Sequence, residues 1–498
     1  APPALRAALS QRIAGNSCAG GHFTPAFSAY DSPFLSDSQQ FSYSNINYYL
    51  PHYERSTQMN KSLWHDASAD VGTPCHAPLS GNISADVLVI GGGMAGLLTA
   101  RMLSEAGAEV VLTERNTLCS GVTQNTTAKI TSQHGLIYAK LTRKYGAKRA
   151  LEYLRANENA LRHYRVLCKK IVCDFEERPS FVYSLNDRRA LKEEVAALDR
   201  IGFPARFTAN IPLPVSTVGA VKFPRQAQFN PLKFAAGVSK GFKIYENTEV
   251  LELTPNTART AKGKITAKAV VCATHFPFIN KHGSYFLKMY QQRSYVLALT
   301  GENVPDIRGM YIDEAENGLS FRNYGKYLLL GGGGHRTGKL GGGWRELCGF
   351  AYKYFPDLKE KFRWATQDCM TLDGIPYIGR YSANTPDFYV ATGFNKWGMT
   401  SSMTAAELLT DMITGRKNEF EQLFSPSRSI LKPQLALNAL EAASNLLTLS
   451  ERRCPHMGCA LKWNPQERTW DCPCHGSRFD ADGNLLDNPA TGSIKADK

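Results

Sequence analysis

The alternation of apolar and polar stretches beyond the first 60 residues predicts an α/β protein. The stretch ADVLVI at 85–90, apolar from Val87 onward, indicates a buried strand, and apolar residues at helical spacing indicate a helix over 94–107. A second strand is expected over 108–114. Amphipathic repeats predict helices through 140–200, whereas 201–350 combines short strands with Pro and Gly turns, which is typical of a sheet that covers a substrate.

Strand and helix signals return in the last quarter of the chain. They predict a strand over 387–394 and a helix over 399–414. An amphipathic linker helix is expected within 426–451. This linker separates the α/β part, 61–425, from a small carboxy-terminal module at 452–498.

Residues 1–60 form an extension of different composition. From Phe23 to Tyr53 the extension is rich in Ser, Tyr, Phe and Asn, whereas solvated disordered segments are poor in aromatic residues. We therefore expect this arm to pack onto the body or onto a partner chain. Arg6 and Arg12, with no acidic residue nearby, are typical of an organellar targeting segment. They predict a mitochondrial location, with the cytoplasm or a plastid as alternatives.

Composition narrows the class of protein. The 498 residues suffice for two or three domains, and the apolar fraction of 43% and charged fraction of 20% are those of a globular protein. The net charge of +14 comes from scattered Lys and Arg, so we expect a solvated basic surface rather than nucleic-acid binding. No apolar run reaches the roughly 18 residues of a membrane span. Most of the 12 cysteines stand singly, as in a reducing compartment.

The glycine-rich stretch VIGGGMAG follows the first strand and opens the first helix. Gly91 would make the tight turn, Gly93 would let backbone amides approach a pyrophosphate, and Gly96 would allow close packing of helix on strand. The helix amino terminus favours the negative charge. Glu114, at the end of the second strand, would accept hydrogen bonds from ribose hydroxyls. The pattern in this context indicates a dinucleotide site.

Further motifs lie downstream in a fixed order, namely GVTQNTTAK, YENTEVLEL, AKAVVCAT, DGIPYIG and ATGFNKWGM. From residue 61 to 425 the chain resembles the D-amino-acid-oxidase and glycine-oxidase superfamily of FAD enzymes. The resemblance implies a Rossmann-type FAD domain of discontinuous segments, interleaved with an α+β substrate domain. It also implies hydride transfer from an amine-bearing carbon to flavin N5. The implied FAD contacts are Gly91, Gly93, Gly96, Glu114, Arg115, Thr127, Val250, Gly374, Gly393, Gly398 and Met399.

Two stretches resemble the strands that approach the flavin in that superfamily, QQRSYVLALTG and LLLGGGGHRTG. Arg293 in the first would hold a substrate carboxylate bidentately, and His335 in the second would act as a general base. A surface arginine and a structural histidine are equally open interpretations. The superfamily's carboxylate-binding Tyr/Arg pair does not carry over, so the resemblance does not establish an amino-acid substrate.

Four cysteines and two histidines gather within CPHMGCALKWNPQERTWDCPCHGS, residues 454–477. Zinc prefers four tetrahedral ligands from paired C-x2–4-C boxes, and it remains the alternative. The boxes here read C-x-H and C-x2-H instead, and the stretch resembles the Rieske [2Fe–2S] motif. A single-iron oxygenase is not expected, because its D-x-x-H-x4–5-H ligand set is absent from the sequence.

The Rieske resemblance implies roles for each residue of these boxes. Cys454 and Cys472 would bind one iron as thiolates, and His456 and His475 would bind the other as neutral imidazoles. Cys459 and Cys474 fall on the positions of a bracing disulfide, and Ser477 falls on a position whose hydroxyl bonds a cluster sulfide. Rieske domains usually carry several strands before the first ligand loop. Here this base sheet is reduced or missing, so we expect the all-β module to depend for its stability on contacts with the flavin domain, the arm or a partner.

Together the two modules predict an oxidoreductase with FAD and a [2Fe–2S] cluster. A small amine-type substrate would give two electrons to FAD, and the cluster would remove them one at a time for an electron-acceptor protein. The alternative is an accessory subunit of a larger organellar electron-transfer complex, in which the same fold has a structural role.

Overall fold

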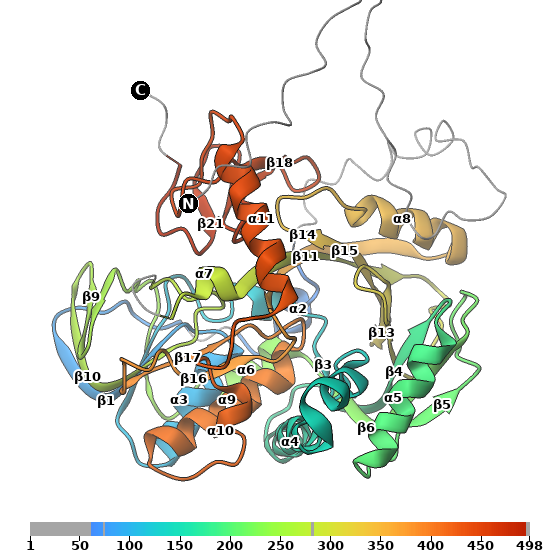
Figure 1. Ribbon diagram of the computed structural model, residues 1–498, viewed down its shortest axis with the longest axis horizontal. Coiled ribbons are helices and arrows are strands. Elements are labelled where there is room, and N and C mark those ends of the chain that lie inside the picture. The colour runs from blue at the N-terminus through green and yellow to red at the C-terminus, as the bar shows by residue number, and fades with distance from the viewer. Residues whose placement is uncertain (1–60, 73–74, 280–282, 495–498) are drawn as a thin grey trace, which may run out of the picture. The chain divides into compact units, whose positions relative to one another are not determined.

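The computed structural model describes residues 61–72, 75–279 and 283–494. The expected packing of the arm, residues 1–60, therefore lies outside the described residues. The described part contains three sheets, of eight, nine and four strands (Figure 1). Short helices α2 (Trp64–Ala67), η2 (Val122–Asn125), α7 (Tyr285–Lys288) and α10 (Glu421–Phe424) connect the larger elements.

The first sheet has the order β16-β17-β10-β1-β2-β7, with the β8–β9 hairpin added at β10. Strands β1, β2, β7, β10 and β17 run parallel, although they come from distant parts of the chain. This confirms the prediction of a Rossmann-type domain built from discontinuous segments. Its strands are β1 (Ile83–Ile90), β2 (Val110–Thr113), β7 (Lys243–Tyr245), β8 (Glu252–Thr254), β9 (Thr257–Thr260), β10 (Gly263–Cys272), β16 (Tyr377–Arg380) and β17 (Phe388–Thr392).

The apolar run of β1 is uninterrupted because both faces of the strand are covered. Val87 and Val89 join the core under helices α3 (Met94–Glu105) and α9 (Gly398–Ile413). Leu88 and Ile90 point the other way, into a second core that includes residues of β8–β10 and β17. A strand buried on both faces reads as a continuous apolar stretch, which is why the sequence located this one well.

The second sheet has the order β15-β11-β14-β13-β12-β4-β6-β3, with β5 paired to β6. Four further helices belong to the part of the chain that forms the two large sheets, namely α4 (Ile137–Cys168), α5 (Arg188–Arg200), α6 (Pro231–Val238) and α8 (Gly343–Tyr354). The sheet's strands are β3 (Lys129–Ile130), β4 (Glu176–Ser184), β5 (Arg206–Thr208), β6 (Gly219–Gln228), β11 (Met289–Thr300), β12 (Met310–Asp313), β13 (Ser320–Tyr324), β14 (Tyr327–Arg336) and β15 (Lys359–Thr371). This sheet is the α+β part that the resemblance implies.

The prediction of helix throughout 140–200 is wrong in its middle. Helix α4 ends at Cys168, and strand β4 follows before helix α5 begins. Phe181, Val182 and Tyr183 of β4 are buried and pair with β6 on one side and with β12 on the other. This segment forms a strand because it pairs with strands distant in sequence. The amphipathic pattern of the helices on either side made it look helical in the sequence.

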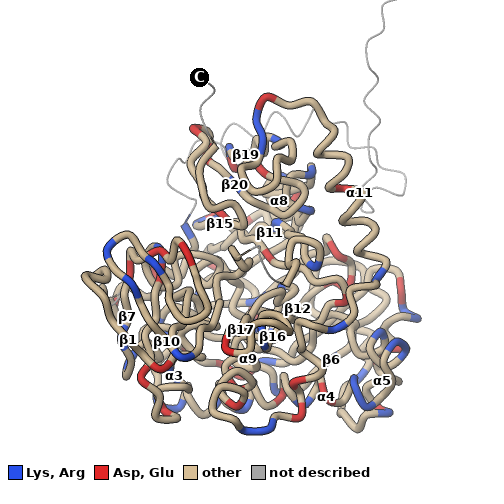
Figure 2. The backbone as a smooth tube through the Cα atoms, turned by 60° about the vertical axis from the view of Figure 1, so that its left-hand side comes forward, with Lys and Arg blue, Asp and Glu red and all other residues tan. Residues whose placement is uncertain are grey.

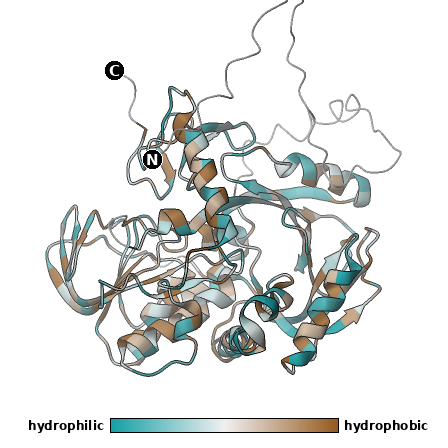
Figure 3. Cartoon of the chain, viewed as in Figure 1, coloured by the Kyte–Doolittle hydropathy of each residue, from teal (hydrophilic) through white to brown (hydrophobic). Residues whose placement is uncertain are grey.

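The third sheet is the small carboxy-terminal one. It is antiparallel in the order β18 (Lys462–Asn464), β19 (Thr469–Asp471), β20 (Arg478–Phe479) and β21 (Leu485–Asp487). Helix α11 (Pro433–Leu447) precedes it, within the stretch where a linker helix is expected. Leu437, Leu440 and Leu447 of α11 are exposed, and Figure 3 shows apolar segments along this helix. In the part of the chain that the structure describes, the module carries no second sheet.

Charged residues of both signs are spread over the described part of the chain. Basic and acidic residues alternate along the backbone in Figure 2, without a continuous basic stripe in that view. Within the described ranges, no helix combines the length and apolar character needed to cross a membrane.

Candidate functional site

A cavity of about 1190 Å³ lies at the carboxyl ends of the parallel strands of the first sheet. Ligand pockets usually have about 300–1,000 Å³, so a dinucleotide and a small substrate have room together. All the FAD contacts implied by resemblance line this cavity except Gly96, namely Gly91, Gly93, Glu114, Arg115, Thr127, Val250, Gly374, Gly393, Gly398 and Met399. Residues from six separate stretches therefore converge at one place.

The glycine loop has the geometry of a pyrophosphate cradle. Gly91 has φ +110°, and a Cβ there would lie 2.6 Å from the Ala273 carbonyl oxygen of the adjoining strand. A Cβ on Gly96 would collide with the Gly91 carbonyl, so Gly96 permits the packing of α3 on the loop rather than contact with a ligand. Gly93 lies at the amino end of α3, where backbone amides and the helix dipole favour phosphate. These residues fit a dinucleotide.

Glu114 is held in place at the end of β2. Its Oε2 accepts a hydrogen bond from the Gly92 amide at 2.7 Å, and its Oε1 accepts one from the Asn116 amide at 2.9 Å. The carboxylate lines the cavity and has further lone pairs for ribose hydroxyls. Its position fits the adenosine half of FAD.

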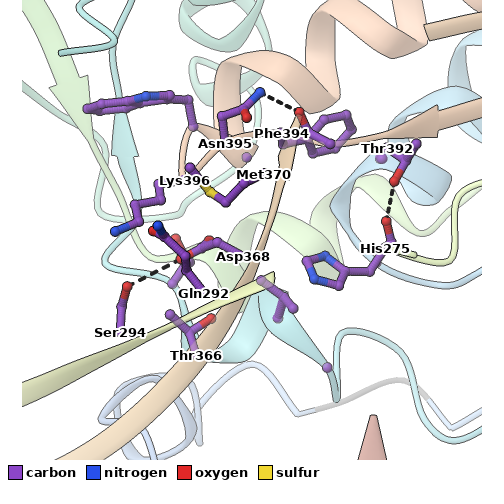
Figure 4. A pocket seen from close by; sticks show the side chains of 18 of the residues that line it. His275, Gln292, Ser294, Thr366, Asp368, Met370, Thr392, Phe394, Asn395 and Lys396 are labelled. Atoms are coloured by element: carbon purple, nitrogen blue, oxygen red, sulfur yellow. Dashed lines mark hydrogen bonds between the residues drawn. The ribbon is translucent and has the colours of Figure 1, made fainter. Parts of the chain in front are cut away.

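On the other side of the cavity, polar side chains of β11 and β15 face inward (Figure 4). Gln292 is 3% exposed, and its Oε1 has no hydrogen-bond partner. Thr366 Oγ1 is also buried without a partner. Ser294 donates to Asp368 at 3.4 Å. This wall thus presents several hydrogen-bond acceptors to the cavity, and the sequence prediction missed all of them.

Asp368 is the ionisable group at the centre of this wall. Burial raises the pKa of its carboxyl, and the charge of Lys396 opposes that shift. Lys396 and Asn395 both have positive φ, 71° and 50°, in the loop before α9. This strained turn brings the lysine to the cavity. His275 also lines it, with Nε2 unpartnered, and burial lowers the pKa of its imidazole.

The two predicted catalytic residues lie away from the cavity lining. Arg293 pairs with Glu467 of the carboxy-terminal module through Nε at 2.9 Å and through Nη2, and only 3% of its side chain is exposed. His335 contacts Tyr295 Oη through Nε2 at 3.0 Å and the Arg336 carbonyl through Nδ1 at 3.0 Å. Neither side chain lines the cavity. Both lie at the contact between the two modules instead.

The cysteine and histidine boxes meet on the loops around β18–β20. Cys454 and Cys472 are buried, and a hydrogen bond from Cys472 contributes most to lowering the pKa of the Cys454 thiol to about 7. The imidazole rings of His456 and His475 lie 5.0 Å apart. Both nitrogens of His456 and Nδ1 of His475 are buried without a hydrogen-bond partner. Two buried thiols and unpartnered buried imidazole nitrogens on the same two loops are donor types that fit a metal centre.

Burial keeps the two histidines in the form that binds metal. It lowers the pKa of His456 to about 4 and that of His475 to about 3, so both rings are neutral at pH 7. Two thiols and two neutral imidazoles match the donor set of a Rieske cluster. A disulfide joins Cys459 and Cys474. The sulfur of Cys472 lies within 4.8 Å of both disulfide sulfurs, so the brace adjoins the predicted ligands.

Comparison with known families agrees with both sites. A family model described as "FAD dependent oxidoreductase" matches residues 86–412, and one described as "Rieske [2Fe-2S] domain" matches residues 425–496. The chain belongs to the FAD-dependent oxidoreductase family. It is an enzyme that uses FAD and a [2Fe–2S] cluster. The Rieske match includes α11, so this helix belongs with the module as much as with the linker.

Similar proteins share one or both parts. The "Putative Rieske 2Fe-2S iron-sulfur protein YhfW" of Bacillus subtilis (strain 168) is 33% identical, over 85% of this chain and 95% of its own. The "Gamma-glutamylputrescine oxidoreductase" of Escherichia coli (strain K12) is 25% identical, over 76% and 96%. The crystal structure of glycine oxidase from Geobacillus kaustophilus has a TM-score of 0.60 at 20% identity, over 70% and 99%. This last likeness concerns the fold.

The Rieske module of this FAD-dependent oxidoreductase completes the wall of the flavin cavity. Four residues at and after the end of β21 line the same cavity as the glycine loop, namely Asp487, Asn488, Ala490 and Thr491. Asn488 Nδ2 donates to the Phe276 carbonyl at 2.6 Å, next to His275. The glycine loop and the Rieske module therefore line one cavity, although nothing in the sequence pattern pairs these segments.

Proposed function

We propose that the enzyme binds a small amine at Asp368, oxidises it with FAD, and passes the electrons one at a time from FAD to the Rieske cluster. The observation that carries this proposal is the shared cavity wall, to which the glycine loop and residues Asp487–Thr491 of the Rieske module both contribute. When bound, FAD accepts a hydride and the cluster accepts one electron at a time. A two-electron oxidation is thereby joined to a one-electron acceptor protein.

The acceptor groups of β11 and β15 support an amine as the substrate. A protonated amine is a hydrogen-bond donor, and it would satisfy the buried Oε1 of Gln292, Oγ1 of Thr366 and the carboxylate of Asp368. The related protein named gamma-glutamylputrescine oxidoreductase supports the same class. Arg293, the residue expected to hold a substrate carboxylate, is occupied by Glu467.

Asp368 would bind the ammonium group and then accept one of its protons. The neutral amine can release a hydride from its α-carbon, because the nitrogen lone pair stabilises the iminium product. Burial raises the pKa of Asp368, which makes the carboxylate a better proton acceptor than an exposed one. The nearby charge of Lys396 opposes this rise in the pKa of Asp368.

The test is an anaerobic amine panel with two spectroscopic signals. Primary amines, polyamines and amino acids are mixed with the purified enzyme, and flavin bleaching is followed together with the EPR signal of the reduced cluster. We expect bleaching by a non-carboxylated amine, followed by the EPR signal. A Cys472→Ser variant should bleach but give no signal. Bleaching by amino acids alone would refute the amine proposal, and bleaching without cluster reduction in the wild type would refute the electron route.

Location and protein partners rest on the sequence alone. A mitochondrial location and a role of the arm in contacting the electron acceptor remain proposals from residues 1–60. Fractionation of the native cells and pull-down with a chain that starts at Lys61 would test them.

A further inference from the structure

Strands β11 and β15 form a two-sided wall between the flavin cavity and the Rieske module. Side chains alternate across a strand, so neighbouring residues face opposite sides. Gln292, Thr366 and Asp368 line the cavity. Their neighbours Gln291 and Gln367, directly beside them in the sequence, contact the Rieske module instead. Each strand thus carries side chains toward the cavity and toward the Rieske module.

The two glutamines hold the backbone at His475, the last predicted cluster ligand, and at Gly476 directly after it. Gln291 Nε2 donates to the His475 carbonyl at 2.8 Å, and Gln367 Nε2 donates to the Gly476 carbonyl at 2.9 Å. Gln367 Nε2 also donates to Gln291 Oε1 at 2.7 Å, so the amides orient each other. Thr337 fixes the far side by donating to Gln367 Oε1 at 3.0 Å.

The fit between loop and wall is close. Gln291 is 1% exposed and Gln367 is 3% exposed. Gly476 has φ +85°, and a Cβ there would lie 2.6 Å from Gln291 Cβ. The loop can approach the strand only because residue 476 is glycine. Two buried amides would be costly in an apolar contact, and here the carbonyls of the ligand loop satisfy their donors.

We propose that Gln291 and Gln367 are positioning residues that fix the His475 loop on the cavity wall, so that electrons pass from FAD to the cluster across β11 and β15. This rests on the proposed function. In each transfer the reduced flavin would give up one electron and the oxidised [2Fe–2S] cluster would take it up. A one-electron acceptor protein reoxidises the cluster before the second transfer. The protons of the reduced flavin go to solvent.

The experiment follows electron transfer inside the intact holoenzyme without any substrate. FAD is photoreduced with a 5-deazaflavin flash, and cluster reduction is recorded by visible absorbance and freeze-quench EPR. We compare wild type, Gln291→Leu, Gln367→Leu and the control Gln466→Leu. Gln466 also donates across the module contact, to the Gly342 carbonyl at 3.2 Å, but it does not touch the ligand loop. Loss of a partner that orients a metal ligand commonly costs about 10–100-fold.

The expected result is slowing of cluster reduction by about 10–100-fold in Gln291→Leu and Gln367→Leu, with FAD content unchanged and the Gln466→Leu rate near that of wild type. Loss of the cluster EPR signal in the two glutamine variants alone would also support the positioning role. Equal rates in all four proteins, or equal losses in Gln466→Leu, would overturn it. If wild type itself transfers no electron to the cluster, the proposed function fails, which is a distinct outcome.

Discussion

Replacing Glu467 with glutamine tests whether one buried carboxylate attaches the Rieske module to the flavin domain. Glu467 Oε2 accepts from Arg478 Nη2 at 2.7 Å, and Glu467 also pairs with Arg293 of β11. Tyr295 donates to its Oε1 at 3.0 Å. The Glu467→Gln variant keeps the shape but removes the charge, and it leaves two buried guanidinium groups without their shared counterion.

The magnitude follows from the pKa of Glu467. Burial alone would raise it, but the charges of Arg293 and Arg478 lower it from 4.5 to about 2. At about 1.4 kcal/mol per pKa unit, this shift corresponds to about 3 kcal/mol in favour of the folded state at neutral pH. Breaking a buried ion pair typically costs about 3–5 kcal/mol, in agreement. Because the folded pKa is depressed, the contribution is complete above about pH 4.5 and is lost as the pH falls toward 2.

The assay is urea unfolding at pH 7 with two probes, since two modules need not unfold together. Visible circular dichroism reports the cluster, and flavin fluorescence reports the FAD domain. We expect Glu467→Gln to lower the cluster transition by about 3 kcal/mol and the flavin transition far less. In wild type, the cluster transition should also weaken between about pH 4.5 and 2, and this dependence should shrink in the variant.

Glu360→Gln is the matched control. The side chain of Glu360 is also buried, at 3% exposed, and also pairs with an arginine. Its partner, Arg363, lies in the same strand, β15, so this ion pair does not join the two modules. Glu360→Gln should leave the cluster transition at its wild-type midpoint. A loss below about 1 kcal/mol in Glu467→Gln, within the range of an exposed pair, would refute the reasoning. So would an unchanged dependence on pH.

Three further substitutions test the individual sites. Asp368→Asn should keep FAD but slow the reduction of the flavin by amines about 10²–10⁴-fold, as measured by stopped flow. The increase of this rate with pH should also disappear, and a wild-type rate would exclude Asp368 as the base. Gly96→Ala should lower the flavin-to-protein ratio because its Cβ meets the Gly91 carbonyl, whereas Gly349→Ala, with open space around it, should not. Cys459→Ser opens a loop of 15 residues and should destabilise the cluster by about 3 kcal/mol, with Cys348→Ser, a free thiol, as the neutral control.

The dinucleotide loop and the cluster boxes could be predicted because their chemistry is local in sequence. Gly91, Gly93 and Gly96 act within one turn and the start of one helix, so consecutive residues carry the whole pattern. The same holds for the ligand boxes, because the short spacing between their Cys and His residues is enough to identify the metal-binding side chains. In the structure Gly91 and Gly93 line the cavity, Cys472 hydrogen-bonds Cys454, and the rings of His456 and His475 lie 5.0 Å apart.

The substrate wall could not be predicted in the same way. The sequence points to the right strand, β11, but to the wrong residue on it. Arg293 is expected in the cavity but contacts the Rieske module, and its neighbours Gln292 and Ser294 line the cavity instead. A one-residue difference reverses the face of a strand. Which face meets the cavity depends on what covers the other face, and here that is the Rieske module, more than 150 residues later in the chain.

The shortness of the Rieske module and its dependence on the flavin domain have one physical cause. Its core contains, besides four cysteines, little more than Leu461, Phe479 and Ala490, and its strand β20 has two residues. So small a sheet buries too little apolar surface to be stable alone. The wall of β11 and β15 replaces the missing base sheet with buried hydrogen bonds and the Glu467 ion pairs. Because the same contacts also fix the His475 loop beside the flavin cavity, a change that weakens the module's attachment should alter its electron transfer as well.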